Sequence, residues 1–80
     1  MTKVRVKTFR GFSEYESIRE ATRAAKDMIL DIITDGQPSH LWWARIDWIE
    51  QKKMRIWSCP KVGVWQFSPW YDLELSLFDD

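Results

Sequence analysis

The chain begins with a segment in which apolar and basic side chains alternate. Val4 and Val6 are each flanked by a lysine or an arginine, which is the period-two pattern of a strand with one side buried and the other in water. This pattern predicts a strand over residues 3–10. Gly11 then allows a turn, and we expect the segment up to Glu16 to connect onward without regular structure.

The spacing of apolar residues becomes helical after Ser17. Ser17 and Glu20 have the spacing of a capping box, in which each side chain satisfies a backbone N–H group that the first helical turn leaves unpaired. Apolar residues then recur every three or four positions as far as Ile32. Gly36, two positions before Pro38, provides a stop. The sequence therefore predicts an amphipathic helix of about 17 residues, close to 25 Å long.

The second half of the chain predicts further strands. Residues 41–49 are rich in Trp and Ile and contain no breaker. Residues 54–59 return after a polar turn, and residues 61–67 continue the pattern. Gly63 in the last of these strands indicates a bulge or the close approach of another chain.

The C-terminal segment, residues 68–80, fits two structures. Ser68 and Pro69 form a good helix start, whereas the leucines at positions 73, 75 and 77 alternate as they do in a strand. The extended form is slightly favoured. In either form we expect this segment to be loosely packed.

The predicted order of elements is β-α-β-β-β, which describes one small α+β domain over residues 1–80. A single amphipathic helix packs on a mostly antiparallel sheet of three to four strands. Alternation places Trp42 and Trp48 on the side of the helix and Trp43 on the opposite side, and we expect Trp57 to point away from the helix together with Trp43. Because one helix covers only one face, the outward rings need cover from the C-terminal segment, from a second copy of the chain or from another protein.

Tryptophan is the most unevenly distributed residue type. All six tryptophans lie between positions 42 and 70 of the 80-residue chain. A chain of this length buries only roughly 60% of the surface that it exposes when unfolded, so large aromatic side chains are a substitute for a larger core. We expect part of this aromatic surface to face a partner.

The composition argues against an enzyme. His40 is the only histidine and Cys59 the only cysteine, so the chain lacks both an internal disulfide and the ligands of a tetrahedral metal site. His40 has no partner at a recognisable spacing that could orient it as a catalytic base, and we expect Cys59 to be a buried, inert thiol. The sequence predicts no catalytic residue, no cofactor and no metal. The unpaired thiol and the lack of a signal-peptide pattern predict a cytoplasmic protein.

A protein-binding surface accounts for more of these features. The cores of interfaces are enriched in Trp, Tyr and Arg, and a few desolvated aromatic anchors supply most of the binding energy. The predicted protein-binding residues are Trp43, Arg45, Arg55, Trp57, Trp70 and Tyr71.

Two other surfaces stay open as alternatives. Basic residues on or between the aromatic strands favour a nucleic-acid-binding domain, because bases stack on exposed rings while cations hold phosphates. The formal net charge of zero weakens this alternative. The second alternative is an acidic face of the helix formed by Asp27, Asp31 and Asp35.

The chain also resembles the small accessory proteins of bacteriophages and mobile elements, including anti-CRISPR inhibitors. The resemblance is one of size and architecture over the whole chain: about 80 residues, a start directly in a strand and no active-site motif. It rests on no family motif. It implies stoichiometric inhibition by binding to a host complex in a bacterial cytoplasm, either as a monomer or as a homodimer.

Overall fold

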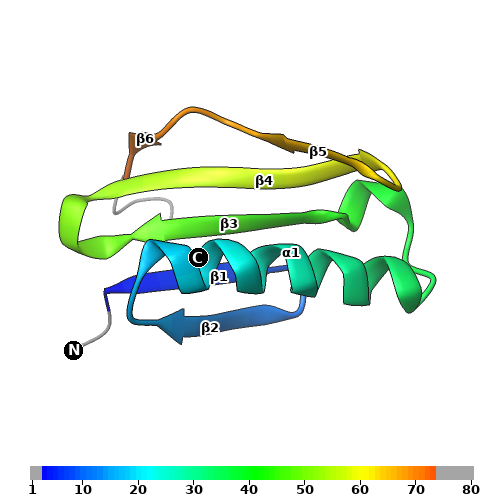
Figure 1. Ribbon diagram of the computed structural model, residues 1–80, viewed down its shortest axis with the longest axis horizontal. Coiled ribbons are helices and arrows are strands. Elements are labelled where there is room, and N and C mark those ends of the chain that lie inside the picture. The colour runs from blue at the N-terminus through cyan, green and yellow to red at the C-terminus, as the bar shows by residue number, and fades with distance from the viewer. Residues whose placement is uncertain (1–2, 74–80) are drawn as a thin grey trace.

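The computed structural model describes residues 3–73, which form one helix against one antiparallel sheet (Figure 1). The strands and the helix are β1 (Val4–Thr8), β2 (Gly11–Tyr15), α1 (Ile18–Thr34), β3 (Trp43–Trp48), β4 (Lys53–Lys61), β5 (Val64–Phe67) and β6 (Tyr71–Asp72). Two short 3-10 turns, η1 (Ser39–Leu41) and η2 (Ile49–Gln51), flank β3. The expected α+β class is confirmed.

The number of strands was predicted wrongly, because the sheet contains six strands and not three to four. The segment expected to be irregular, residues 11–15, is strand β2, which pairs with β1 through a turn at Phe9 and Arg10. Its sequence, Gly-Phe-Ser-Glu-Tyr, lacks the alternating apolar pattern of a half-buried strand, and four of its five residues are exposed in the structure. Pairing with β1, which sequence periodicity does not report, makes it a strand.

The helix begins and ends close to where the sequence predicts. The Oγ atom of Ser17 accepts a hydrogen bond from the backbone N–H of Glu20 at 3.2 Å, which is one half of the expected capping box. At the other end, the N–H of Gly36 donates to the carbonyl of Ile33. Gly36 has φ +79°, a left-handed conformation that glycine adopts without strain.

The sheet has the order β2-β1-β3-β4-β5, and β6 pairs with β4 beyond the end of β5. Figure 1 shows α1 running along β1 and β3, and its packing contacts are mostly with these two strands. The helix therefore leaves much of β4 and β5 uncovered on its side of the sheet.

The main core lies between α1 and the two central strands. Ala21 and Ala25 are fully buried and bring the helix close to Ala44 and Ile46 of β3. Trp42 and Trp48 pack against the edge of this core, as their alternation predicted. The indole Nε1 of Trp42 donates a hydrogen bond to the carbonyl of Gln37 at 2.9 Å, which attaches the loop after α1 to the start of β3.

The Ser17 cap is expected to contribute measurably to stability. Replacing Ser17 by Ala removes the acceptor for the Glu20 N–H and should lower the free energy of unfolding by about 1 kcal/mol. Urea unfolding followed by circular dichroism measures this change. The control is Ser13→Ala at an exposed position of β2. Equal stability of the two variants would show that the cap makes no net contribution.

Candidate functional site

A row of aromatic and basic side chains covers the part of the sheet that α1 leaves free. The register pairs Ala44 with Trp57 and Trp57 with Phe67, and paired residues of an antiparallel sheet point to the same face. Trp57 and Phe67 therefore lie on the side of the helix. The expectation that Trp57 points away from the helix was wrong, because its pairing with Ala44 turns its ring into the core. We call this row the aromatic ladder; its members are Lys26, Trp48, Arg55, Trp57, Trp65, Phe67 and Trp70.

The inner end of the aromatic ladder joins the helix to β4 and β5. The Nζ atom of Lys26 lies 4.7 Å from the centroid of the Trp57 ring and 6.0 Å from that of Trp65. Trp57 is only 8% exposed and belongs to the hydrophobic core. The aliphatic stem of Lys26 can cover apolar surface while its ammonium group stays near water, so this residue seals the edge of the core.

The outer end of the aromatic ladder is a clamp around Arg55. Its guanidinium carbon lies 4.7 Å from the centroid of the Phe67 ring and 4.5 Å from that of Trp70. Trp70 in turn packs against Trp48, with ring centroids 5.5 Å apart. Phe67 is 56% exposed. The two rings hold the guanidinium group by cation–π contacts. Its Nε atom is buried without a hydrogen-bond partner among the described residues, so a partner would reach the terminal N–H groups.

Neither cation of the aromatic ladder is neutralised by the residues that the structure describes. The ion pairs among residues 3–73 include those of Arg10, Arg45 and Lys53, and none of these uses Lys26 or Arg55. Within the same range, the Nε1 group of Trp57 is buried without an acceptor. The site therefore combines one exposed ring, Phe67, and several partly buried rings with two positive charges that have no acidic partner in the described part of the chain.

The opposite face of the sheet carries both acidic and basic side chains. Asp47 of β3 is paired in register with Arg5 of β1 and Met54 of β4, and it is fully buried. The Nε atom of Arg45 lies 3.0 Å from the Oδ1 atom of Asp47. Burial raises the pKa of Asp47, while the nearby Arg45, Arg5 and Lys7 act in the opposite direction.

The structure divides the six predicted binding residues between the two faces. Arg55, Trp57 and Trp70 belong to the aromatic ladder. The other three are Trp43, Arg45 and Tyr71, and the register places them on the opposite face with Ser58, Ile56 and Met54 as their respective neighbours on β4. Trp43 is half-buried and Tyr71 is 50% exposed.

Sequence reasoning missed several members of the aromatic ladder. The spacing of Trp65 and Phe67, two positions apart within the predicted strand 61–67, places both rings on one face. This spacing alone indicates that the two rings belong to one surface. Trp48 was predicted to face the helix and does so. Lys26 is one of the charged residues between the apolar positions of the helix, and no sequence pattern reports that it reaches over the Trp57 ring of β4.

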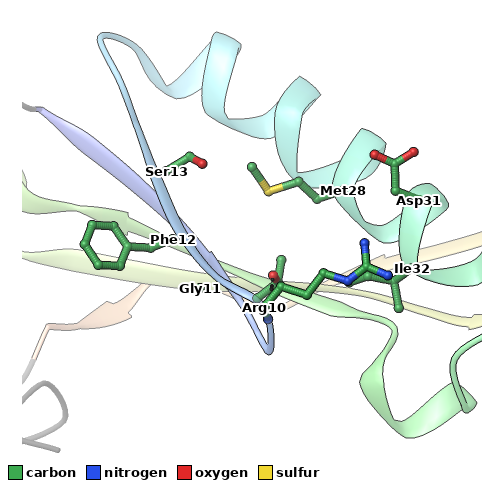
Figure 2. Close-up of a pocket in the computed structure, with 8 residues that line it drawn as sticks. Arg10, Gly11, Phe12, Ser13, Met28, Asp31 and Ile32 are labelled. Carbon is green, nitrogen blue, oxygen red and sulfur yellow. Dashed lines mark hydrogen bonds between the residues drawn. The ribbon is translucent and has the colours of Figure 1, made fainter. Parts of the chain in front are cut away.

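The alternative acidic face on α1 is partly occupied by the protein itself. Asp35 accepts hydrogen bonds from Arg10 at 2.7 Å and from Gln37 at 3.1 Å. Asp31 lines a small cavity of about 190 Å³ between α1 and the β1–β2 turn. Figure 2 shows Met28 and Asp31 on the helix side of this cavity, whereas the Phe12 ring points away from it. Asp27 is exposed, and none of the ion pairs described for residues 3–73 uses it.

The residues weighed for catalysis occupy ordinary positions. His40 is exposed in η1. Cys59 is buried, as predicted, and its thiol donates to the carbonyl of Lys61 at 3.0 Å. Within residues 3–73 no group of three or more His, Cys, Asp or Glu side chains is arranged to hold a metal ion, and no helix is long and apolar enough to cross a membrane.

Comparison with known proteins assigns no relative to this chain. No family model matches it, and neither a curated protein nor a solved structure is similar to it. Any functional argument for this protein therefore rests on its own residues and on the geometry of its surfaces.

The two ends of the aromatic ladder are expected to differ in their effect on stability. Trp57→Ala empties a core position and should lower the free energy of unfolding by about 3–5 kcal/mol. Phe67→Ala removes an exposed ring and one aromatic contact, and should cost about 1 kcal/mol. Thermal and urea unfolding of the two variants measures the difference. Similar losses in both would show that Phe67 is structural rather than available to a partner.

Asp47 is expected to make stability depend on pH. Its raised pKa means that the folded protein holds this proton more tightly than the unfolded chain does. The stability gained from protonated Asp47 is therefore complete below the unfolded pKa of about 3.9 and is lost as the pH rises through the folded pKa. Urea unfolding at a series of pH values should show the difference in unfolding free energy, native protein minus Asp47→Asn, falling as the pH rises above about 4. A constant or rising difference would contradict this assignment.

Proposed function

We propose that this protein is a non-enzymatic protein-binding module and that the aromatic ladder is its contact surface. The observation that carries the proposal is the Arg55 clamp. An arginine held between Phe67 and Trp70, with no acidic partner among residues 3–73, presents a fixed positive group beside exposed apolar surface. Tyr, Trp and Arg in such surroundings supply most of the binding energy in protein interfaces.

The rigidity of the clamp supports this role. Each ring that contacts Arg55 is itself held by a second ring, since Phe67 packs on Trp57 at 4.8 Å and Trp70 packs on Trp48 at 5.5 Å. A side chain that is already ordered loses little conformational entropy when a partner binds. The surface is therefore arranged for binding before the partner arrives.

The partner is another protein in this proposal, and a host complex is the partner that the resemblance to phage inhibitors predicts. A second copy of the chain is the other protein that could use the same rings. The proposed contact surface includes only three of the six residues expected from the sequence, because Trp43, Arg45 and Tyr71 lie on the opposite face of the sheet. Their participation requires a partner that contacts both faces.

A nucleic-acid-binding function is a second candidate because of one further observation. Arg19 and Arg23 line an open depression along α1 that also includes Lys26. Of these three cations, Lys26 lies over the rings of Trp57 and Trp65. A nucleic-acid single strand that stacks on rings while its phosphates meet cations needs such a combination. Its affinity would fall steeply with added salt.

The proposal is tested by comparing matched variants of the two sheet faces. Phe67→Ala removes a ring of the aromatic ladder, and Phe12→Ala removes a similarly exposed ring on the opposite face (58% exposed). Proteins captured from a nuclease-treated bacterial lysate are identified and purified, and their affinities for the native protein and both variants are measured by calorimetry. We expect Phe67→Ala to weaken binding about tenfold or more, since hot-spot rings contribute at least that much, and Phe12→Ala to have no effect.

The outcomes separate the candidates. Equal affinity of the native protein and Phe67→Ala for every purified partner would reject the aromatic ladder as the contact surface. Binding of a single-stranded oligonucleotide that weakens from low to high salt, without any bound protein, would favour the second candidate instead.

A further inference from the structure

Among residues 3–73, the outer edge of the short strand β5 pairs with no other strand. Strand β5 pairs with β4 on one side and ends the sheet on the other (Figure 1). Its residues, Val64–Phe67, include neither a charge nor a proline. Edge strands are normally protected by charged residues, proline or bulges, because their unpaired backbone groups can join a strand from another chain. The other edge, β2, carries Glu14.

The backbone groups that point outward from β5 belong to the residues of the aromatic ladder. The N–H of Ser68 donates to the carbonyl of Ile56 on β4 at 2.9 Å. Backbone groups alternate in direction along a strand of an antiparallel sheet. The N–H and C=O groups of Phe67 therefore point to the open edge. The same alternation applies to Trp65, two residues earlier.

The charge next to this edge is positive. The guanidinium of Arg55 lies over the Phe67 ring and so is displaced from β4 towards β5, and Lys26 lies near Trp65. An added strand would lie about 4.8 Å from β5 and direct every second side chain to the helix side. A carboxylate on that side meets Arg55, whose N–H edges are not used by any described acidic residue.

We propose that the edge of β5 binds an extended, acidic segment of a partner protein as an additional strand. Backbone hydrogen bonds to Trp65 and Phe67 supply affinity, and carboxylates opposite Arg55 and Lys26 select the sequence, which is the usual division in strand addition. This inference rests on the proposed function and specifies its binding mode. An unpaired backbone edge complements another polypeptide and has no counterpart in a nucleic acid, which is why a protein segment is the occupant.

The inference is tested with linear peptides selected from a random displayed library against the full chain. We expect the enriched peptides to alternate acidic and apolar residues. Hydrogen exchange of the complex should then show slower exchange at the amides of Trp65 and Phe67. A library that yields no binder, or binders without acidic residues, would overturn the inference.

Matched variants separate the charge from the backbone edge. Arg55→Gln removes a cation held by rings, and Arg5→Gln removes a similar one on the opposite face, where Arg5 lies 4.8 Å from the Phe12 ring. Binding of the selected peptide should weaken about tenfold in Arg55→Gln, the effect of one charge-assisted contact, and should not change in Arg5→Gln. Circular dichroism checks that both variants are folded. Equal effects of the two variants would contradict the proposed selection by charge.

Two substitutions of Phe67 isolate the backbone. Phe67→Ala removes the ring and keeps the N–H, whereas Phe67→Pro removes both. Strand addition predicts a further loss of about tenfold from Ala to Pro. If binding weakens in Phe67→Ala but is no weaker in Phe67→Pro, the edge is not used and this inference fails while the proposed function stands. If neither change weakens binding, both fail.

The other occupants of the edge give distinct results. A second copy of the chain would appear as a dimer in light scattering of the free protein, and the dimer would be lost in Phe67→Pro. A nucleic acid would appear as Arg55-dependent binding of single-stranded DNA in the absence of peptide binding. Either result would overturn an acidic protein segment as the occupant.

Discussion

The sheet of this protein is wider than its helix, and the side chains on β4 and β5 are arranged around that mismatch. Helix α1 packs mainly on β1 and β3, where alanines on the helix allow close contact. Beyond it, large rings have to exclude water from the sheet, because the described residues contain no second α-helix to cover them. Trp57 is the ring nearest the helix and is almost completely buried, whereas Phe67 is more than half exposed. The same row of rings is therefore core at one end and accessible surface at the other.

The cations of the aromatic ladder follow from the same mismatch. A ring at the edge of a small core needs a neighbour that is apolar along its length and can end in water, and long basic side chains meet both needs. Lys26 covers Trp57 in this way, and Arg55 lies between Phe67 and Trp70. Cation–π contacts replace ion pairs here, so the positive charges remain available to an acidic partner. A requirement of packing thus accounts for both cations of the surface that we propose as the contact surface.

The opposite face of the sheet solves its burial problem with charge pairs. Asp47 is completely buried, and Arg45 lies beside it on the same strand. A buried carboxylate is tolerated only where cations and hydrogen bonds compensate the loss of water. On this face a buried carboxylate lies beside arginines, whereas the charged members of the aromatic ladder are all cations. The two faces also explain why one continuous patch did not form from all six residues expected at the binding site.

Periodicity within single segments determined the helix, its Ser17 cap, the strands in the second half of the chain and the helix-side position of Trp42 and Trp48. These features depend on neighbours a few residues apart, which a sequence displays directly. The tertiary structure alone decided that residues 11–15 form β2, that Trp57 faces the helix and that Lys26 reaches it. Each of these depends on which segments become neighbours and in what register. Pairing between strands brings together residues distant in the chain, and no local pattern records the partner.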